Sequence, residues 1–578
     1  MPHTRVGHDH QRQIGQVFIG SSAGLVQRQI RGPLVERPWK LMLPMMQRDV
    51  KSSDAFRWTA IVGAFIVLAL IAFVRIRLLD VPLERDEGEY AYIAQLMLDG
   101  IPPYRDAYTM KFPGTAMMYA LFMAFFGRTP AGIHLGLFIV NMLCMILVYR
   151  LGRRTGDRET ALIASGFYGV LSLSQSVSGI HAHATHFVIL FVLAGLLTLL
   201  RSFEPDGKYW LSASGICFGT AILMKQHAAV FALLGAVLLT IEVRRTHGGS
   251  IWNKVRVLLL FTITVAAPLA LLAVAMWYFG LFKMFYFWTA QYAFQYAVQI
   301  PPEEGAQLFI YYASGIVGNQ LAIWFLAAIG CCSLLAKRES RSEHRFMSVL
   351  AVFSFLAITP GLVFRQHYFI LALPAVALLA AEGLSLARFI IYSRWIPGAV
   401  LAVAVGFGMY AEQDYLFTLS PNEVTRATYG KNPFPEARMV ADLIAQRTTE
   451  EDRILVLGSE PEIYFYANRR AATGHIYMYG LMENQPFASV MQDEMIDQVE
   501  RMRPRYIVYA NVSASWGLTD SSITRVLTWA QNYLGRSYEI VGYVETLDPE
   551  MPVFVPANNL NRYGILSDSY LALYKRIS

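Results

Sequence analysis

Long apolar runs are the feature that most constrains how this chain can fold. An apolar helix of about 20 residues crosses the hydrocarbon core of a bilayer, and only helices or closed barrels satisfy their backbone hydrogen bonds there. About eleven runs of this kind follow one another, and they predict a polytopic α-helical membrane protein. They lie near 57–79, 131–150, 160–177, 184–201, 209–224, 227–243, 256–280, 307–335, 347–363, 368–388 and 395–411.

The composition agrees with a protein that lives in a bilayer. Of the 578 residues, 55% are hydrophobic and only 16% are charged, whereas a soluble domain carries about 25% charged residues. This excludes an ordinary soluble enzyme, a disordered chain and a nucleic-acid binder, so membrane lipids are the expected surroundings. The cysteines lie in apolar runs and suggest neither a disulfide framework nor a metal site. They are Cys144, Cys217, Cys331 and Cys332.

Basic residues predict the orientation of the chain. The net charge is +7, and Lys and Arg gather in alternate loops, as the positive-inside rule expects of cytoplasmic loops. We therefore expect a multi-pass protein of the inner (plasma) membrane whose N-terminus is cytoplasmic. The run at 113–127, of roughly 15 residues, is too short to span and predicts an interfacial helix. The basic loops are 150–158, 201–208, 244–256 and 336–345.

Three parts are expected along the chain. Residues 1–55 are polar and basic and predict a cytoplasmic, disordered tail, although Met46 could equally begin the chain. Residues 56–411 form the transmembrane region, with the first outer loop at 80–130. Residues 412–578 have a soluble composition, with strand-like runs between helix-like segments, and predict a small α/β domain on the periplasmic or extracytoplasmic side. The strand-like runs are 453–458, 505–510 and 538–547.

The first outer loop concentrates acids, aromatic residues, prolines and one lysine at the membrane surface. Asp86, Glu87 and Glu89 begin a segment whose apolar residues recur at helical spacing, which predicts an interfacial helix. The acids can carry chemistry, or they can cap this helix and favour its positive end. For Glu89 the capping interpretation is preferred.

Three elements of the loop, in their order, resemble the signature of the GT-C integral-membrane glycosyltransferases. They are Arg85-Asp86-Glu87, Gly100–Asp106 and Lys111-Phe112-Pro113-Gly114. The group most similar is glycosyltransferase family 39, which includes protein O-mannosyltransferases and aminoarabinose-transferase-like enzymes. Segments 218–227 and 365–383 are similar to later helix ends of that family. The resemblance implies a GT-C fold and transfer of a sugar from a polyprenyl-phosphate donor to an acceptor hydroxyl.

The resemblance and the chemistry together predict residue roles. A sugar on a lipid phosphate has a leaving group that is already a stable anion, so one carboxylate base and cations near the phosphate should suffice. Asp86 is the predicted catalytic base. Glu87, about 100° further around the helix, is expected to hold neighbouring loops or the acceptor. The predicted substrate-binding residues are Arg85, Glu87, Tyr104, Lys111, Lys225, Arg365 and His367.

Among the cations, Lys111 is the first choice for the donor phosphate and Arg365 the second. The alternative for these two, and for Lys225 and His367, is a side chain that merely snorkels at a helix end. The aromatic loop 282–305 either covers a lipid tail or sugar or forms an interfacial belt.

Metal dependence is left open by the sequence. Aminoarabinose-transferase-like members place a metal-binding Glu just before the loop lysine, where this chain has Met110, which argues against a zinc site of that kind. His181, His183 and His186 can bind a metal or phosphate, or make surface or acceptor contacts. No cofactor is predicted with certainty, and a divalent metal is compatible with the sequence.

The predicted enzyme is thus a membrane glycosyltransferase that transfers a hexosyl or pentosyl group, with inversion if displacement is direct. The acceptor classes left open are a cell-envelope glycan, a lipid and a protein. One rival is a transporter or flippase, which should show ionisable residues near mid-membrane, broken helices and repeated halves, whereas the polar residues here gather at outer helix ends and no internal repeat is evident. The other rival is a non-catalytic subunit of polysaccharide assembly.

Overall fold

The computed structural model describes residues 54–246, 251–336, 342–391, 396–546, 552–559, 564 and 566–577. The chain separates into two compact units, Met1–Thr59 and Ala60–Ser578. The fold and the site lie within the second. The predicted tail at 1–55 lies almost wholly outside the described residues.

Every predicted apolar run contains a described helix, and α2 (Asp54–Arg77) covers most of the first. The helices of the runs predicted at 160–177 and 347–363 end earlier, at Leu171 and Leu356. Four described helices are long and apolar enough to cross a membrane, or five if one bent pair counts as a single span. Eleven spans therefore remain a prediction. The other helices are α5 (Pro130–Thr155), α6 (Arg158–Leu171), α7 (Ala184–Ser202), α8 (Lys208–Met224), α9 (Ala229–Thr246), α10 (Ile251–Tyr278), α13 (Pro302–Asn319), α14 (Leu321–Ala336), α15 (Ser342–Leu356), α16 (Leu373–Ile391) and α17 (Ile396–Ala411).

The run predicted at 307–335 is not one continuous helix. It is the bent pair, α13 and α14, which meet at 103°. Both residues at the break are held by one carboxylate, because Asn319 and Gln320 donate side-chain hydrogen bonds to Glu412 at 3.0 and 3.4 Å. Glu412 directly follows the last apolar run of the chain, so the pattern of the run at 307–335 alone does not reveal these contacts.

Close helix crossings and an apolar exterior characterise the bundle. At the contact of α14 with α16, a Cβ on Gly383 would lie 2.1 Å from the carbonyl oxygen of Leu326, so glycine permits the approach.

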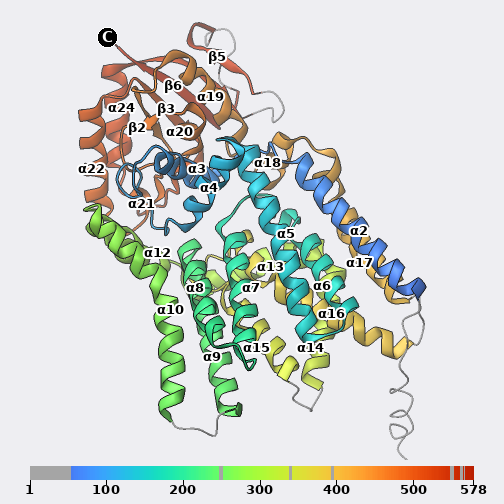
Figure 1. Cartoon of the computed structure of the whole chain (residues 1–578). Helices are drawn as coiled ribbons and strands as arrows, with labels where there is room; N and C mark the ends of the chain where they lie inside the picture. Colours follow the sequence, from blue (N-terminus) through green and yellow to red (C-terminus); the bar gives the residue numbers. More distant parts are fainter. Residues whose placement is uncertain are drawn as a thin grey trace, which may run out of the picture. The chain divides into compact units, whose positions relative to one another are not determined.

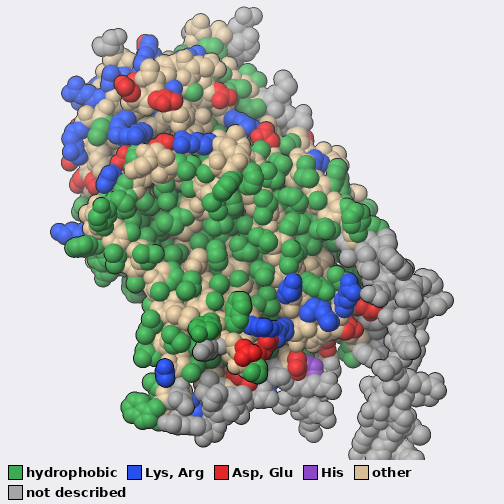
Figure 2. Space-filling view, viewed as in Figure 1, with side chains coloured by type: hydrophobic (Ala, Val, Ile, Leu, Met, Phe, Trp, Pro, Cys, Tyr) green, Lys and Arg blue, Asp and Glu red, His purple; other side chains and the backbone are tan. Residues whose placement is uncertain are grey.

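Apolar side chains on α5, such as Ile139, Leu143 and Ile146, are exposed. Figure 2 shows a broad hydrophobic band over the helices, with charged side chains gathered beyond it at both ends. This is the surface expected of a protein that spans a bilayer.

Two of the predicted cytoplasmic loops lie at the same end of the bundle. Arg154, at the end of α5, forms an ion pair with Glu204, after α7, with 2.6 Å between Nη1 and Oε1. Arg201 pairs with the same carboxylate. The shared contact agrees with the predicted grouping of these loops, while the side of the membrane remains a prediction.

The outer loop forms the two short helices α3 (Arg85–Leu98) and α4 (Gly114–Phe126), where interfacial helices were expected. Glu84 is the N-cap of α3, and it forms a capping box with Glu87, in which each side chain accepts a hydrogen bond from the other residue's backbone N–H. The two helices pack on each other, and α4 also packs on α5 and α8.

The C-terminal part contains a six-stranded mixed sheet in the order β2-β1-β3-β6-β4-β5 (Figure 1). The predicted strands at 453–458, 505–510 and 538–547 are confirmed as β1 (Arg453–Leu457), β3 (Tyr506–Asn511) and β4 (Tyr538–Glu545). β3 is parallel to β1 and antiparallel to β6. The other elements are α18 (Pro421–Tyr429), α19 (Phe434–Arg447), α20 (Glu462–Ala467), β2 (Arg470–Ala471), α21 (Tyr479–Met482), α22 (Ala488–Met502), α23 (Ser513–Trp516), α24 (Arg525–Ser537), β5 (Phe554–Pro556) and β6 (Tyr570–Arg576).

The sheet part and the outer loop pack closely through α20 and α3. A Cβ on Gly88 would lie 2.6 Å from the backbone nitrogen of Glu462, so only glycine allows this approach without a shift. Tyr92 accepts a hydrogen bond from the backbone of Ala471 at 2.8 Å. The helices and the sheet thus belong to one compact unit, and the predicted domain boundary at 411/412 stays a prediction.

Candidate functional site

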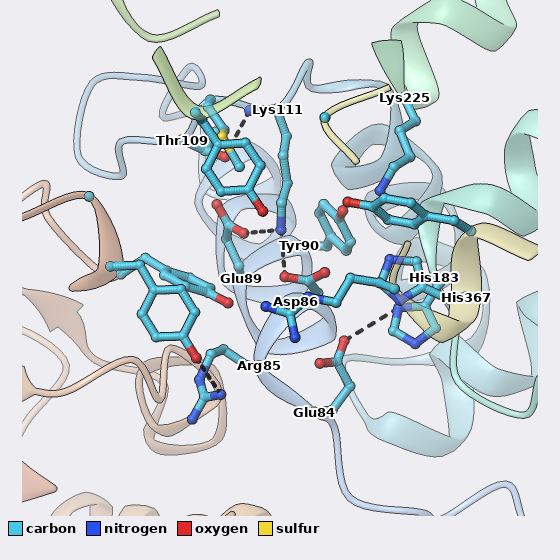
Figure 3. Close-up of a pocket in the computed structure, with 18 of the residues that line it drawn as sticks. Glu84, Arg85, Asp86, Glu89, Tyr90, Thr109, Lys111, His183, Lys225 and His367 are labelled. Atoms are coloured by element: carbon cyan, nitrogen blue, oxygen red, sulfur yellow. Dashed lines mark hydrogen bonds and ion pairs between the residues drawn. The ribbon is translucent and has the colours of Figure 1, made fainter. Parts of the chain in front are cut away.

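A cavity of about 620 Å³ lies where the outer loop, the ends of several helices and the C-terminal part meet (Figure 3). Its lining joins segments that are far apart in the sequence: the start of α3, the loop before α4, the segments that precede α7 and α16, and the end of α8. Six of the eight predicted site residues line it, namely Arg85, Asp86, Lys111, Lys225, Arg365 and His367.

Lys111 lies at the centre of a group of charged side chains that line the cavity. Its Nζ donates to Oδ1 of Asp86 at 2.7 Å and to Oε2 of Glu89 at 2.5 Å, as Figure 3 shows. Asp86 and Glu89 are three residues apart, so they share one face of α3. The ammonium also lies 4.6 Å from the centre of the Tyr90 ring. The preferred capping interpretation of Glu89 is therefore wrong, because Glu84 caps the helix and Glu89 binds the lysine.

The Lys111 pairing controls the ionisation of Asp86. Burial raises the pKa of this carboxyl, but the neighbouring ammonium outweighs it and holds the pKa below its ordinary value. Asp86 is consequently an anion at neutral pH. For Glu84, burial and the nearby carboxylates raise the pKa well above its ordinary value.

The Pro-Gly break after Lys111 brings this lysine close to the end of α8. A Cβ on Gly114 would lie 2.4 Å from the carbonyl oxygen of Leu223, so the glycine permits contact of the two backbones. Thr115 donates to the carbonyl of Met224 at 2.9 Å, and Gln226 donates to the carbonyl of Met110 at 2.9 Å. These bonds fix the loop lysine relative to Lys225, the residue that follows α8.

Lys225 and Arg365 supply two further cations. Lys225 Nζ lies 4.2 Å from the centre of the Tyr368 ring, and burial lowers the pKa of Lys225 to about 7. Arg365 is exposed and follows a backbone segment with positive φ at Gly361, Leu362 and Phe364. Non-glycine residues in this region are strained, and such strain concentrates at functional sites. Among the described residues, no carboxylate forms an ion pair with either cation.

Arg85 lines the cavity, but its guanidinium binds residues of the C-terminal part. It forms an ion pair with Glu460 at 2.9 Å and donates to the carbonyl of Ser459 at 2.5 Å and to the hydroxyl of Tyr479 at 3.1 Å. This residue therefore joins the outer loop to the segment that carries Tyr477 and Tyr479, both of which line the cavity.

Glu87 and Tyr104 lie outside the cavity lining, and their predicted contact with substrate needs correction. The Glu87 side chain is fully buried and accepts hydrogen bonds from His134, His181 and the backbone of Ala182 at 2.9, 2.9 and 2.5 Å. The alternative that it holds neighbouring loops is the one the geometry supports. Tyr104 is buried and donates to the carbonyl of Lys111 at 2.9 Å, so it holds the backbone of the loop lysine.

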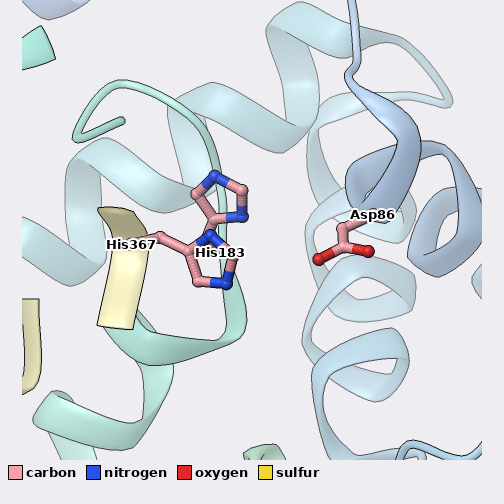
Figure 4. Close-up of side chains that lie close together, drawn as sticks. All are labelled: Asp86, His183 and His367. Atoms are coloured by element: carbon pink, nitrogen blue, oxygen red, sulfur yellow. The ribbon is translucent and has the colours of Figure 1, made fainter. Parts of the chain in front are cut away.

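The three histidines of the 181–186 segment have different surroundings. His181 binds Glu87, His186 is buried, and only His183 lines the cavity. His183 stacks on His367 with 4.0 Å between the ring centres, and burial lowers the pKa of His183 to about 3. Figure 4 shows the carboxylate of Asp86 facing these two rings. The three side chains offer one oxygen and two nitrogens to a metal.

Several lining residues were not predicted from the sequence. Glu84 precedes the Arg85-Asp86-Glu87 motif, so its position beside the motif was the signal. Trp288 and Tyr292 lie in the aromatic loop 282–305, for which contact with a lipid tail or sugar was one of the two expectations. Tyr429, Tyr477 and Tyr479 come from segments with no motif, and no signal in the sequence linked them to the outer loop.

Comparison with known proteins identifies one similar family and several similar structures. Residues 110–277 match the family model of dolichyl-phosphate-mannose-protein mannosyltransferases. A search of curated protein sequences finds no match. The structure of ArnT from Cupriavidus metallidurans bound to undecaprenyl phosphate is 15% identical, with a TM-score of 0.58, over 88% of this chain and 97% of that one. Its apo structure gives 14% identity and a TM-score of 0.56, over 90% and 98%.

A third similar structure is the oligosaccharyltransferase of Archaeoglobus fulgidus in complex with Zn and sulfate. It is 14% identical, with a TM-score of 0.50, over 85% of this chain and 73% of that chain. These likenesses confirm the predicted resemblance to GT-C glycosyltransferases, and the solved structures show that the chain shares their fold.

Proposed function

We propose that this protein transfers a sugar from a polyprenyl phosphate to an acceptor hydroxyl. The observation that carries the proposal is the convergence of three cations, Lys111, Lys225 and Arg365, on the cavity that also holds Asp86. The family model and ArnT support the donor class, because their names include dolichyl-phosphate mannose and undecaprenyl phosphate. The proposed acceptor is a glycan, a lipid or a protein.

The cations suit the phosphate of the donor. Breaking the bond between the sugar and the phosphate leaves negative charge on a phosphate oxygen, and fixed positive charge stabilises that transition state. Lys225 and Arg365 have no carboxylate ion pair among the described residues, so an anionic ligand can satisfy them. A phosphate beside Lys225 would also favour its charged form.

The Lys111 contact suggests how Asp86 becomes available. Without a donor, Lys111 occupies Oδ1 of Asp86. A donor phosphate competes for the ammonium, and Oδ1 is then free to accept the hydrogen bond of an acceptor hydroxyl. In the proposed step the acceptor oxygen bonds to the anomeric carbon as the bond from carbon to phosphate oxygen breaks. Asp86 takes the acceptor proton, polyprenyl phosphate leaves with the electron pair, and the direct displacement inverts the anomeric centre.

The proposal includes the side of the membrane. With the basic loops in the cytoplasm, the cavity and residues 412–578 face the outside, where a membrane-bound activated sugar is the natural donor. Tyr477 and Tyr479 line the cavity, and we assign to this C-terminal part a role in contacting the acceptor.

Sugar transfer by purified protein tests the proposal. Dolichyl-phosphate mannose and a panel of undecaprenyl-phosphate sugars are supplied in nanodiscs with acceptor extracts, and Asp86→Asn is compared with the wild type. Asp106→Asn is the matched control, because Asp106 belongs to the same loop but not to the cavity lining. We expect transfer to fall by about 10³-fold or more in Asp86→Asn only.

The same preparation separates the rival functions. Undiminished transfer in folded Asp86→Asn would contradict the proposed mechanism. Movement of a labelled lipid between leaflets without any transfer would favour the flippase, and absence of both activities across the donor panel would favour a non-catalytic subunit.

A further inference from the structure

The aromatic segment at 282–305 presents different side chains to the cavity and to the outside. Tyr286, Phe294 and Val298 are each more than half exposed, as an interfacial belt requires. A belt accounts for this outer face, but it does not account for aromatic residues of the same segment that enclose a polar cavity. The residues of the segment that line the cavity are Trp288, Tyr292, Ala293, Tyr296 and Ala297.

Trp288, Tyr292 and Tyr296, which we call the aromatic stripe, recur at every fourth residue. In a regular α-helix four residues turn through about 400°, so a row at this spacing drifts around the helix by about 40° at each step. The stretch Phe287–Tyr292 is instead a π-helix, whose i→i+5 hydrogen bonds widen the turn and reduce this drift. π-helical turns are rare and are frequent at functional sites. The local winding therefore helps to keep the three rings on the cavity side.

Glu483 contacts the aromatic stripe from the C-terminal part. It also lines the cavity, and its Oε2 accepts hydrogen bonds from the Tyr292 hydroxyl at 2.6 Å and from the Gln299 amide at 3.2 Å. A Cβ on Gly480 would lie 2.8 Å from the Tyr292 hydroxyl, so glycine permits this close approach.

The second oxygen of Glu483 is available to a ligand. Among the described residues, no hydrogen bond reaches Oε1 and no cation forms an ion pair with this carboxylate. Oε1 is also absent from the side-chain atoms that are buried without a partner, so the cavity reaches it. A carboxylate oxygen accepts hydrogen bonds from hydroxyl groups, and such charge-assisted bonds are about twice as strong as neutral ones.

Tyr296 links the stripe to the charged group around Lys111. The charges of Arg365, Glu483, Asp86 and Lys111 all act on its hydroxyl, so the ring lies near both the cations and the free carboxylate oxygen. Tyr296 is half-buried, and its hydroxyl has no hydrogen-bond partner in the part of the chain that the structure describes. An aromatic ring and two unused polar groups thus lie beside the cations assigned to the donor phosphate.

We propose that the aromatic stripe and Glu483 bind the sugar ring of the donor. This inference rests on the proposed function, which assigns the donor phosphate to Lys111, Lys225 and Arg365. The sugar is bonded directly to that phosphate, so it must lie within about one ring of the cations, where Tyr296 is found. The ligand class is a neutral sugar that packs its C–H face on an aromatic ring and donates one hydroxyl to Oε1 of Glu483.

Lipid binding by the full-length protein tests this subsite. Protein in detergent micelles is titrated with dolichyl-phosphate mannose and with the undecaprenyl-phosphate sugars, and each is compared with its lipid phosphate that lacks the sugar. Tyr296→Leu and Glu483→Gln are compared with the wild type. Tyr286→Leu is the matched control, because Tyr286 belongs to the same aromatic segment but is 51% exposed and does not line the cavity.

The wild type and the control should bind at least one sugar-bearing lipid more tightly than the matching lipid phosphate. In Tyr296→Leu and Glu483→Gln this preference should fall by about tenfold, the effect of one lost hydrogen bond to a charged group. The affinity for the sugar-free lipid phosphate should change by less than about twofold, which also shows that the variants are folded.

Three results would overturn the subsite: no preference for any sugar-bearing lipid in the wild type, equal weakening of both kinds of lipid, or an unchanged preference in both variants. The outcome for the proposed function is separate. A preference that depends on Tyr296 and Glu483 in a wild type that transfers no sugar would leave the subsite intact and count against the proposed function alone. Sugar transfer with an unchanged preference in both variants would do the reverse.

Discussion

Lys111→Met should destabilise the folded protein by leaving acidic side chains in the cavity wall without their cation. Lys111 contacts Asp86 and Glu89, whose side chains are 22% and 3% exposed, while Lys111 itself is 19% exposed. Removing one partner of a buried ion pair costs about 3–5 kcal/mol. Because Asp86 is partly screened by solvent, we expect the lower end, about 3 kcal/mol.

Thermal unfolding in detergent micelles measures this loss. The unfolding entropy is about 2 cal/mol/K per residue, and dividing the loss of about 3 kcal/mol by the entropy of the whole chain gives a fall in Tm of roughly 3 °C. The loss should depend on pH. In the variant Asp86 loses the ammonium that outweighs its burial, so its folded pKa rises. The stability difference from wild type is complete above the folded pKa of the variant and narrows as the pH falls toward the folded pKa of wild type, which lies below the ordinary value of about 4.

Two further variants isolate the cause. Lys283→Met removes an exposed lysine from another outer segment and should change Tm by less than 1 °C, within the roughly 0.5 kcal/mol of a surface substitution. Glu89→Gln added to Lys111→Met should recover about 1 kcal/mol, since it removes the more buried orphaned carboxylate. If Lys111→Met unfolds within 1 °C of wild type at pH 8, or if the difference in Tm is the same at pH 3, the charge argument is wrong.

Three other predictions concern neighbouring features. Gly88→Ala places a Cβ 2.6 Å from the Glu462 backbone, so it should cost about 1–3 kcal/mol in thermal unfolding, whereas Gly63→Ala, with open space around it, should have little effect. Glu87→Gln should lower stability by about 1–3 kcal/mol, and equal Tm values for variant and wild type would count against its role in holding the histidines. Because the pKa of Lys225 is about 7, binding of undecaprenyl phosphate at pH 8 should take up a proton. Calorimetry in two buffers of different ionisation enthalpy detects this uptake, which Lys225→Met should abolish.

The features that could be predicted from the sequence are those that follow from local patterns of residues. Apolar runs near 20 residues long produced the helices, and the strand-like segments became β1, β3 and β4. The loop motif predicted that Asp86 and Lys111 belong to the site, because these residue types and their order carry the resemblance. Helix geometry also separated Asp86 from Glu87, which indeed face different partners.

The remainder depends on long-range contacts that no local pattern encodes. The bend between α13 and α14 involves Glu412, about 90 residues away. The cavity aromatics Tyr477 and Tyr479 lie in a segment that resembles ordinary soluble sequence. Of three neighbouring histidines, only His183 faces the cavity, because Glu87 binds His181 and the turn into α7 buries His186.

The Arg85 contacts have a consequence for how this protein matures. The guanidinium binds Ser459 and Glu460, and Tyr477 completes the wall beside Lys111 at 5.7 Å. The charged loop is made early in synthesis, but its enclosing wall is made only after the whole helical region has emerged. A nascent chain therefore carries an unfinished cavity through most of its biogenesis. A C-terminally truncated chain would lack this wall and the partners of Arg85, so proteolysis of such chains would remove molecules whose cavity is incomplete.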